Sequence, residues 1–136
     1  MEFVVIGGLA VAWYCSDRKA DDMDLLVNPS NENSVRISRV LDSLGMQGHS
    51  ESSFTKLGLQ VPLKQRYYAE LLTPRKDDPT YSDVAKDAVD AKLFNVPVRV
   101  ASAATLIRLK EQAASSAEAQ RDKHVKDIEC LKEYVL

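Results

Sequence analysis

The chain has 136 residues, of which 45% are hydrophobic and 28% are charged, and its formal net charge is −2. This length and composition predict one domain, residues 1–136, large enough to bury a core without a disulfide or metal staple. The charge provides no basic surface for bulk nucleic-acid binding, so an RNA or DNA partner requires a local basic patch. Cys15 and Cys130 form neither a disulfide framework nor a zinc motif, which indicates a reduced, cytoplasmic protein.

The apolar start of the chain predicts neither a signal peptide nor a membrane span. It lacks a basic segment, and Glu2 stands where a lysine or arginine is expected. Gly7 and Gly8 interrupt the apolar stretch, which is too short to cross a bilayer, so no membrane partner is expected. The chain begins inside its first predicted strand. Without a helix before this strand, one sheet face is expected to stay uncovered unless a partner protein, or a second copy of the chain in a homodimer, covers it.

Two short apolar runs near the N-terminus predict buried strands, at Phe3–Ile6 and at residues 23–27. The glycine pair ends the first run, and residues 9–15 read as a short buried helix. A second helix is expected after the second strand, capped by Ser30 or Asn31. Gly45 ends this helix. Its expected apolar face consists of Val35, Val40, Leu41 and Leu44.

The middle of the chain predicts a loop and further strands. Residues 46–64 are polar, with a weak strand expected near residues 54–57, and residues 65–72 form a better strand. Residues 74–83 read as a loop. Residues 88–102 read as a hairpin with its turn near Asn95 and Pro97.

Two helices are predicted at the C-terminus. The first is capped by Ser102 and runs to about residue 117, buried through Leu106, Leu109 and Ala113. The second starts near residue 119 and carries on one face Val125, Ile128, Leu131 and Val135. The order of elements predicts an α+β fold with a mixed sheet backed by helices.

An acidic pair lies at the start of the second strand. Asp22 and Asp24 flank Met23, and side chains two apart on a strand share one face. Adjacent carboxylates repel each other unless a cation lies between them, and Mg²⁺ or Mn²⁺ suits such ligands. Glu70, an acidic residue in an otherwise apolar strand, is the candidate third ligand. The alternative is a solvated polar strand end that binds no metal.

The glycine pair and Arg18 suggest a phosphate site beside these acids. Gly7 and Gly8 at a helix start offer backbone N–H groups and the positive end of the helix dipole. Arg18 adds a forked donor for phosphate oxygens, with a local salt bridge as the alternative. A glycine pair by itself often serves only a tight turn. Together these residues predict a nucleotide site within one strand–turn–helix–strand unit.

Gly-Gly, then Ala, then Arg-x-x-x-Asp-x-Asp before apolar residues resembles the nucleotidyltransferase fold of the DNA polymerase beta-like superfamily. The closer resemblance is to small bacterial nucleotidyltransferase-like proteins that include abortive-infection toxins of toxin–antitoxin systems. The stretches "VRVASAATLIRLKEQAA" and "RDKHVKDIECL" are similar to the C-terminal helices of that group. The resemblance covers nearly the whole chain.

The resemblance implies transfer of a nucleoside monophosphate from an NTP to a hydroxyl of RNA, protein or a small molecule. It implies Mg²⁺ or Mn²⁺ as cofactor and, for a toxin, an antitoxin protein as partner. The residues with implied catalytic roles are Asp22, Asp24, Glu70 and Lys110, the first three as metal ligands. The residues with implied nucleotide-binding roles are Gly7, Gly8, Arg18 and Asp127.

Some positions depart from the pattern of the family. Ala20 stands where the family often has Thr, and Glu70 replaces the usual Asp. The extra methylene of Glu70 moves the carboxylate by roughly 1 to 1.5 Å, which can cost on the order of 100-fold in rate. The alternative is therefore a degenerate fold that binds nucleotide or a partner without turnover. Lys110 and Asp127 also have plainer roles, as a solvated lysine and its ion-pair partner or a surface charge.

Overall fold

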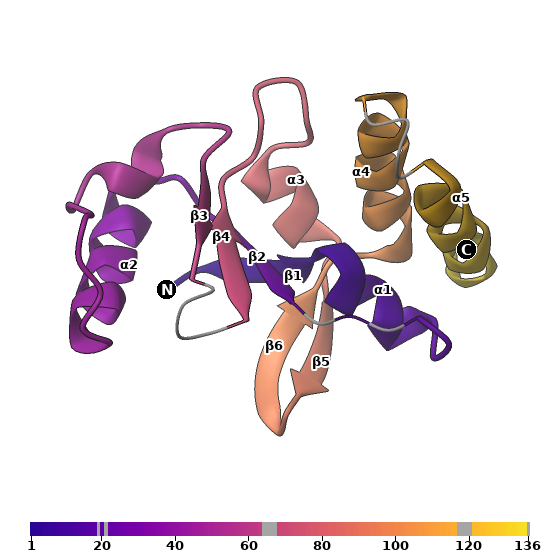
Figure 1. The fold of residues 1–136 in the computed structure, drawn as a ribbon, viewed down its shortest axis with the longest axis horizontal. Helices are drawn as coiled ribbons and strands as arrows, with labels where there is room; N and C mark the ends of the chain where they lie inside the picture. Colours follow the sequence, from indigo (N-terminus) through magenta and orange to yellow (C-terminus); the bar gives the residue numbers. More distant parts are fainter. Residues whose placement is uncertain (19, 21, 64–67, 117–120, 136) are drawn as a thin grey trace.

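The computed structural model describes residues 1–18, 20, 22–63, 68–116 and 121–135, and side chains 113–124 lie outside its description (Figure 1). In these parts of the chain, no helix is long and apolar enough to cross a membrane. The fold is α+β, as predicted, with one six-stranded sheet. Its strands are β1 Phe3–Ile6, β2 Met23–Val27, β3 Gln60–Pro62, β4 Ala69–Leu72, β5 Val89–Leu93 and β6 Val96–Val100.

The sheet is mixed, with the strand order β3-β4-β2-β1-β6-β5. The central strand β1 runs antiparallel to β2 and parallel to β6. Strand β2 pairs in parallel with β4, and antiparallel pairs complete both sides of the sheet. The two parallel pairs, β1 with β6 and β2 with β4, join strands that are not consecutive in the sequence, as parallel pairing requires.

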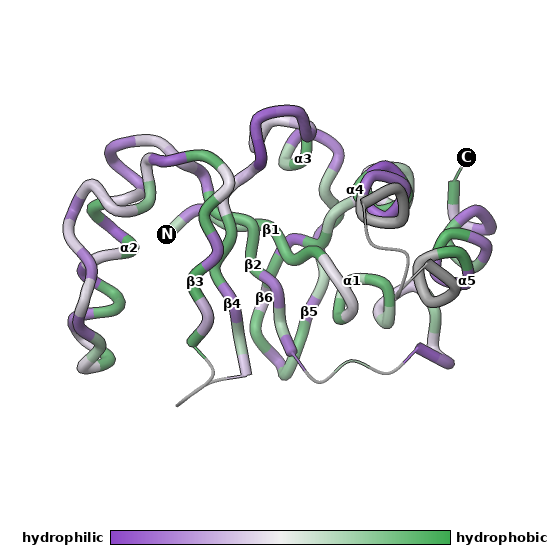
Figure 2. Tube along the Cα trace, turned by 45° about the horizontal axis from the view of Figure 1, so that its top comes forward, coloured by the Kyte–Doolittle hydropathy of each residue, from purple (hydrophilic) through white to green (hydrophobic). Residues whose placement is uncertain are grey.

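Helices cover the sheet in two groups. They are α1 Gly7–Tyr14, α2 Asn31–Ser43, α3 Tyr81–Lys86, α4 Ala103–Ser116 and α5 Arg121–Leu131, with 3₁₀ turns η1 Ser53–Thr55 and η3 Lys132–Tyr134. Helix α2 lies at one side of the molecule, and α4 and α5 pack together at the other, next to α1 (Figure 1). Figure 2 shows hydrophobic residues concentrated along β1, β2 and α1 in the middle of the molecule.

The core lies where β1, β2 and α1 meet. Val4 and Val5 of β1 are fully buried, as are Ala10 and Val11 of α1. Helix α1 is apolar on most of its surface and has little amphipathic character, which suits a helix enclosed on several sides. The two N-terminal strands predicted from apolar runs are confirmed at the predicted residues. Helix α1, however, starts at Gly7 itself, with no separate turn before it.

The predicted apolar face of α2 is partly wrong. Val40 is 40% exposed, and the buried positions are mostly polar. They are Asn33, Ser34, Ile37, Ser38 and Leu41. Ser34 accepts a hydrogen bond from the backbone N–H of Phe54, and Ser38 shares one with His49. Because these hydrogen bonds satisfy the two serine hydroxyls, the polar side of α2 can be buried, although the pattern of apolar residues predicts that it is exposed.

Two middle elements differ from the prediction. The weak strand expected near residues 54–57 is absent from this described stretch: Ser53–Thr55 is a 3₁₀ turn, and the strand begins at Gln60. The end of the expected loop, residues 81–83, forms the first turn of α3, whose capping box joins Thr80 and Asp83 through both backbone N–H groups. The hairpin is confirmed, with its turn at Phe94–Asn95, and so is Ser102 as the cap of α4.

The cysteines do not match the reduced state expected from the sequence. Cys15 at the end of α1 and Cys130 of α5 form a disulfide, with their Cα atoms 6.4 Å apart. The two cysteines are 115 residues apart, so no local cysteine spacing predicts that they pair. The predicted face of α5 is also partly wrong. Leu131 is buried as predicted, whereas Val125 is 41% exposed and Asp127, which was not placed on this face, is buried.

Candidate functional site

Two acidic residues lie side by side on one face of the sheet. In the parallel pair of β2 and β4, Asp24 is the register partner of Glu70, and Ile6 of β1 pairs with Asp24 from the other side. Register partners project to the same face, so both carboxylates stand next to each other, level with the last residue of β1. Asp22 lies two residues before Asp24, just outside β2.

These carboxylates suit a hard cation in their chemistry. Mg²⁺ is commonly held by one or two carboxylates together with the phosphates of a substrate, and Asp24 and Glu70 supply two. Among the residues that the structure describes, no group of three or more His, Cys, Asp and Glu side chains is arranged to hold a metal by protein ligands alone. The donor set therefore fits a cation shared with phosphate oxygens.

The start of α1 lies against Asp24. Gly7 has a φ of +71°, and a Cβ atom built on it would lie 2.2 Å from Oδ2 of Asp24. Only glycine allows this backbone and this close approach. A Cβ atom on Gly8 would lie 3.2 Å from a terminal nitrogen of Arg18. The glycine pair thus gathers an acidic and a basic side chain around the N-terminal, electropositive end of α1.

A buried carboxylate joins the two predicted cations. Nε of Arg18 donates to Oδ1 of Asp127 at 3.0 Å, and Nζ of Lys110 lies 3.3 Å from Oδ2 of the same carboxylate. The Asp127 side chain is 5% exposed, against 20% for Arg18 and 12% for Lys110. The Asp127 carboxylate therefore holds both cations near the N-terminal end of α1. The structure thus gives Arg18 an ion-pair partner from α5, far from it in the sequence.

A pocket of about 270 Å³ extends from this place along the sheet. Its floor is formed by Ile6, Leu26 and Leu72, and α4 contributes Leu106, Leu109 and Lys110. Leu26 and Leu72 are register partners two residues beyond Asp24 and Glu70, so the floor is the same sheet face as the acidic pair. Gly7 lines the pocket as well.

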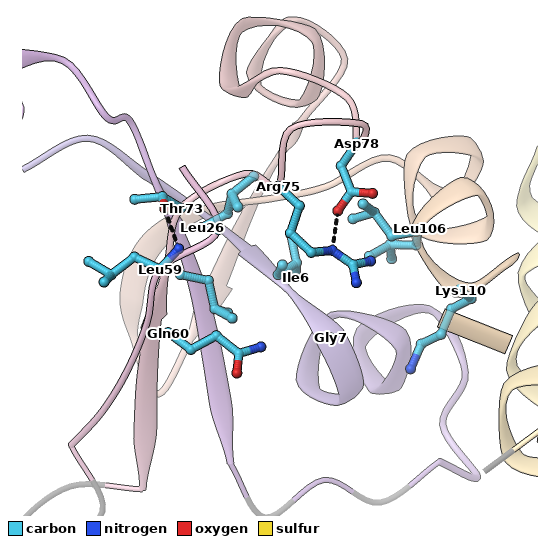
Figure 3. A pocket seen from close by; sticks show the side chains of 13 residues that line it. Ile6, Gly7, Leu26, Leu59, Gln60, Thr73, Arg75, Asp78, Leu106 and Lys110 are labelled. Atoms are coloured by element: carbon cyan, nitrogen blue, oxygen red, sulfur yellow. Dashed lines mark hydrogen bonds and ion pairs between the residues drawn. The ribbon is translucent and has the colours of Figure 1, made fainter. Parts of the chain in front are cut away.

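Charged residues from the loop after β4 also border the pocket. In Figure 3, Arg75 and Asp78 stand over it, joined by a 2.8 Å contact between Nε and Oδ2, and Lys110 extends from α4 toward α1. The sequence did not single out Arg75 or Asp78, because both fall in a stretch read only as a loop. The sequence feature that could have identified them is the polar stretch directly after β4, because loops at the ends of strands often carry functional residues.

The structure brings the sequence-predicted residues together from distant parts of the chain. Contacts or register link Gly7 with Asp24, Asp24 with Glu70, Gly8 with Arg18, and Asp127 with both Arg18 and Lys110. Asp22 adjoins the group, two residues before Asp24 and just outside β2.

No model of a known protein family matches the chain, and neither does any curated protein. Among solved structures, the chain is similar to an antigenic nucleotidyltransferase-like protein from Paracoccidioides brasiliensis, with a TM-score of 0.58 and 16% sequence identity. The similarity covers 96% of this chain and 66% of that protein, so the chain spans just under two thirds of its length. At this identity the likeness shows the fold, which is nucleotidyltransferase-like.

Proposed function

We propose that the chain is a metal-dependent nucleotidyltransferase that moves a nucleoside monophosphate from an NTP to a hydroxyl of RNA, protein or a small molecule. The observation that carries the proposal is the position of Asp24. Its carboxylate touches Gly7 at the start of α1 and stands beside Glu70 on β4. A helix start suited to phosphate and two carboxylates suited to a cation lie together, and this supports phosphoryl transfer.

The residues of the chain would divide the work between binding and charge neutralisation. Asp22, Asp24 and Glu70 would hold Mg²⁺ or Mn²⁺, which when bound neutralises the phosphates of the nucleotide. Arg18 and Lys110, held in place by Asp127, would orient the negatively charged phosphates next to Gly8. Glu70 would also accept the proton of the attacking hydroxyl, the role that the resemblance implies.

Thermal unfolding with each of ATP, GTP, CTP and UTP, with and without Mg²⁺ or Mn²⁺, tests the binding step. A ligand at 100 times its dissociation constant adds about 2.7 kcal/mol of stability, which raises Tm measurably in a domain of this size. We expect a metal-dependent rise for at least one nucleotide and its loss in the Asp22→Asn/Asp24→Asn double variant. Glu51→Gln is the matched control, because Glu51 is an exposed acid outside the site.

Transfer is tested separately from binding. Nucleotide labelled at its α-phosphate is incubated with the chain and with RNA, and label on RNA or on protein is measured together with released pyrophosphate. Labelled product that disappears in Glu70→Gln supports the enzyme. No rise in Tm with any nucleotide in the presence of either cation contradicts the proposal.

The second candidate is a nucleotide- or partner-binding module without turnover. It is favoured by the observation that Arg18 and Lys110 are both ion-paired with the same buried carboxylate, an arrangement that also serves as a structural link. This candidate predicts the rise in Tm without pyrophosphate release. The toxin role and the antitoxin partner rest on the resemblance alone and form the finer part of the proposal.

A further inference from the structure

Strand β5 leaves one edge of the sheet open. It is the outermost strand on its side and pairs with β6 in the register from Val89↔Val100 to Leu93↔Val96. In the described part of the chain, no strand pairs with its other edge. Along β5, residues alternate between half-buried and exposed, with Asp90 and Lys92 exposed. An open edge presents unpaired backbone groups that can pair with another strand.

The turn of the hairpin determines which backbone groups face outward. Phe94 and Asn95 have φ values of 52° and 66°, which fit a two-residue turn of type I′. In such a hairpin the flanking residues, Leu93 and Val96, exchange both backbone hydrogen bonds. The alternation along an antiparallel pair then directs the N–H and C=O groups of Ala91 toward β6. Those of Asp90 and Lys92 face the open edge.

We propose that β5 pairs antiparallel with β5 of a second copy of the chain, about a two-fold axis at Ala91. This register sets Asp90 opposite the partner's Lys92, and Lys92 opposite the partner's Asp90, on the exposed side. On the half-buried side, Val89 meets the partner's Leu93. Opposite charges and apolar pairs directly across an antiparallel ladder both stabilise it. The outward backbone groups of Asp90 and Lys92 form its hydrogen bonds.

The charges on β5 select this register. An axis at Asp90 would set two carboxylates face to face, and an axis at Lys92 would do the same with two ammonium groups. Both arrangements are destabilising. Charged residues on an edge normally discourage pairing, but residues of alternating sign leave one self-complementary arrangement. The hairpin tip adds apolar surface at the same end of the sheet, with Phe94 83% and Val96 56% exposed.

Cysteine cross-linking tests the register. In the proposed dimer, residue 91 faces its own copy in a non-hydrogen-bonded pair, whose Cα atoms are close enough for a disulfide. Mild oxidation of the Ala91→Cys variant is therefore expected to give a covalent dimer, identified by mass spectrometry of the peptide joined through residue 91. Val89→Cys is the matched control, because its two thiols would lie about 13 Å apart along the strands. Equal cross-linking of both variants would overturn the proposal.

Charge exchange tests the pairing without new cysteines. Sedimentation velocity over a concentration series is expected to show a monomer–dimer equilibrium for the unmodified chain. Lys92→Asp turns both attractive pairs into repulsive ones and is expected to weaken the dimer on the order of tenfold. Asp90→Lys/Lys92→Asp restores opposite charges with exchanged positions and is expected to restore the dimer. A chain that stays monomeric, or a double variant as weak as Lys92→Asp, would overturn the proposal.

Circular dichroism separates misfolding from loss of pairing in these variants. Asp90 and Lys92 are exposed, so the helical signal and Tm of each variant at low concentration are expected to match those of the unmodified chain. Arg39→Glu, a charge reversal at an exposed position of α2, is the control for a general effect of net charge. If Arg39→Glu weakens the dimer as much as Lys92→Asp does, pairing through β5 is refuted.

Discussion

The structure around the site requires glycine to different degrees at Gly7 and Gly8. Gly7 combines a left-handed backbone with the carboxylate of Asp24 in the space that a Cβ atom would fill. Gly8 has an ordinary backbone and faces the end of a flexible arginine at a tight but adjustable distance. The sequence motif presents the two as equivalent, whereas the structure requires glycine strictly at Gly7.

Alanine substitutions are expected to separate the two positions. Gly7→Ala should destabilise the fold by more than the roughly 1–2 kcal/mol of a left-handed backbone, because Asp24 must also move. Gly8→Ala should change stability by less than about 1 kcal/mol, since improved helix propensity offsets a small shift of Arg18. Urea denaturation measures both. A Gly7→Ala variant as stable as Gly8→Ala would contradict the close packing of Asp24 on the helix start.

Residue types near the site could be predicted from the sequence, but their partners could not. The glycine pair, Arg18 and the acidic pair fall within one short segment, and their chemistry is readable there. From the sequence, Asp127 could equally be the ion-pair partner of Lys110 or a surface charge. It is buried and ion-paired with two cations, and one of these, Arg18, lies 109 residues away in the sequence. Nothing in local periodicity encodes a partner at that separation.

Helix α1 connects the two halves of the fold at the level of elements. Its last residue, Tyr14, donates a hydrogen bond of 2.9 Å to the carbonyl of Ala101, at the junction between β6 and α4. Burial raises the pKa of Tyr14 above its ordinary value of 10.0. The neutral phenol is therefore the form that the folded state prefers.

The Tyr14 hydroxyl is expected to make the fold sensitive to alkaline pH. The unfolded chain releases the phenolic proton at a lower pH than the folded chain, so stability is fully present below pH 10.0 and is lost as pH rises through the raised folded value. Tyr14→Phe should cost about 1 kcal/mol at neutral pH through the lost hydrogen bond. Urea titrations between pH 8 and pH 11 (roughly, spanning the tyrosine range) should show a smaller alkaline loss in the variant. An unchanged alkaline slope would contradict the assignment.

Apolar periodicity located the elements better than it located their buried faces. It placed β1 and β2 correctly, because central strands are continuous apolar runs. It failed for α2 and α5, whose buried positions include hydrogen-bonded serines and an ion-paired aspartate. Helix α3 was missed although its capping pair, Thr80 and Asp83, stands at the spacing that signals a helix start.

At the scale of the whole molecule, the site is assembled from both ends of the sequence. The segment after α1 and helix α5 are joined twice, by the Arg18–Asp127 ion pair and by the Cys15–Cys130 disulfide. Cys15 is three residues before Arg18, and Cys130 is three residues after Asp127. The two links therefore restrain the same pair of segments, one covalently and one through charge.

Two parallel links predict that α5 leaves the fold only when both are broken. Reduction by excess dithiothreitol should lower global stability by roughly 2–4 kcal/mol, the usual effect of opening a long loop, while the ion pairs of Asp127 keep α5 in place. Asp127→Asn in the oxidised chain should weaken the site, yet the disulfide should keep α5 next to α1.

Hydrogen exchange followed by mass spectrometry measures this directly, with peptides from α5 compared with peptides from β1 and β2. We expect α5 amides to stay protected in the reduced chain and in oxidised Asp127→Asn. In reduced Asp127→Asn, they should lose protection before the amides of the central strands, because contiguous elements can unfold locally below the global free energy. Release of α5 by reduction alone would show that the disulfide is the principal link. Protection in the doubly broken chain would instead assign the docking of α5 to apolar packing around Leu131, which is fully buried.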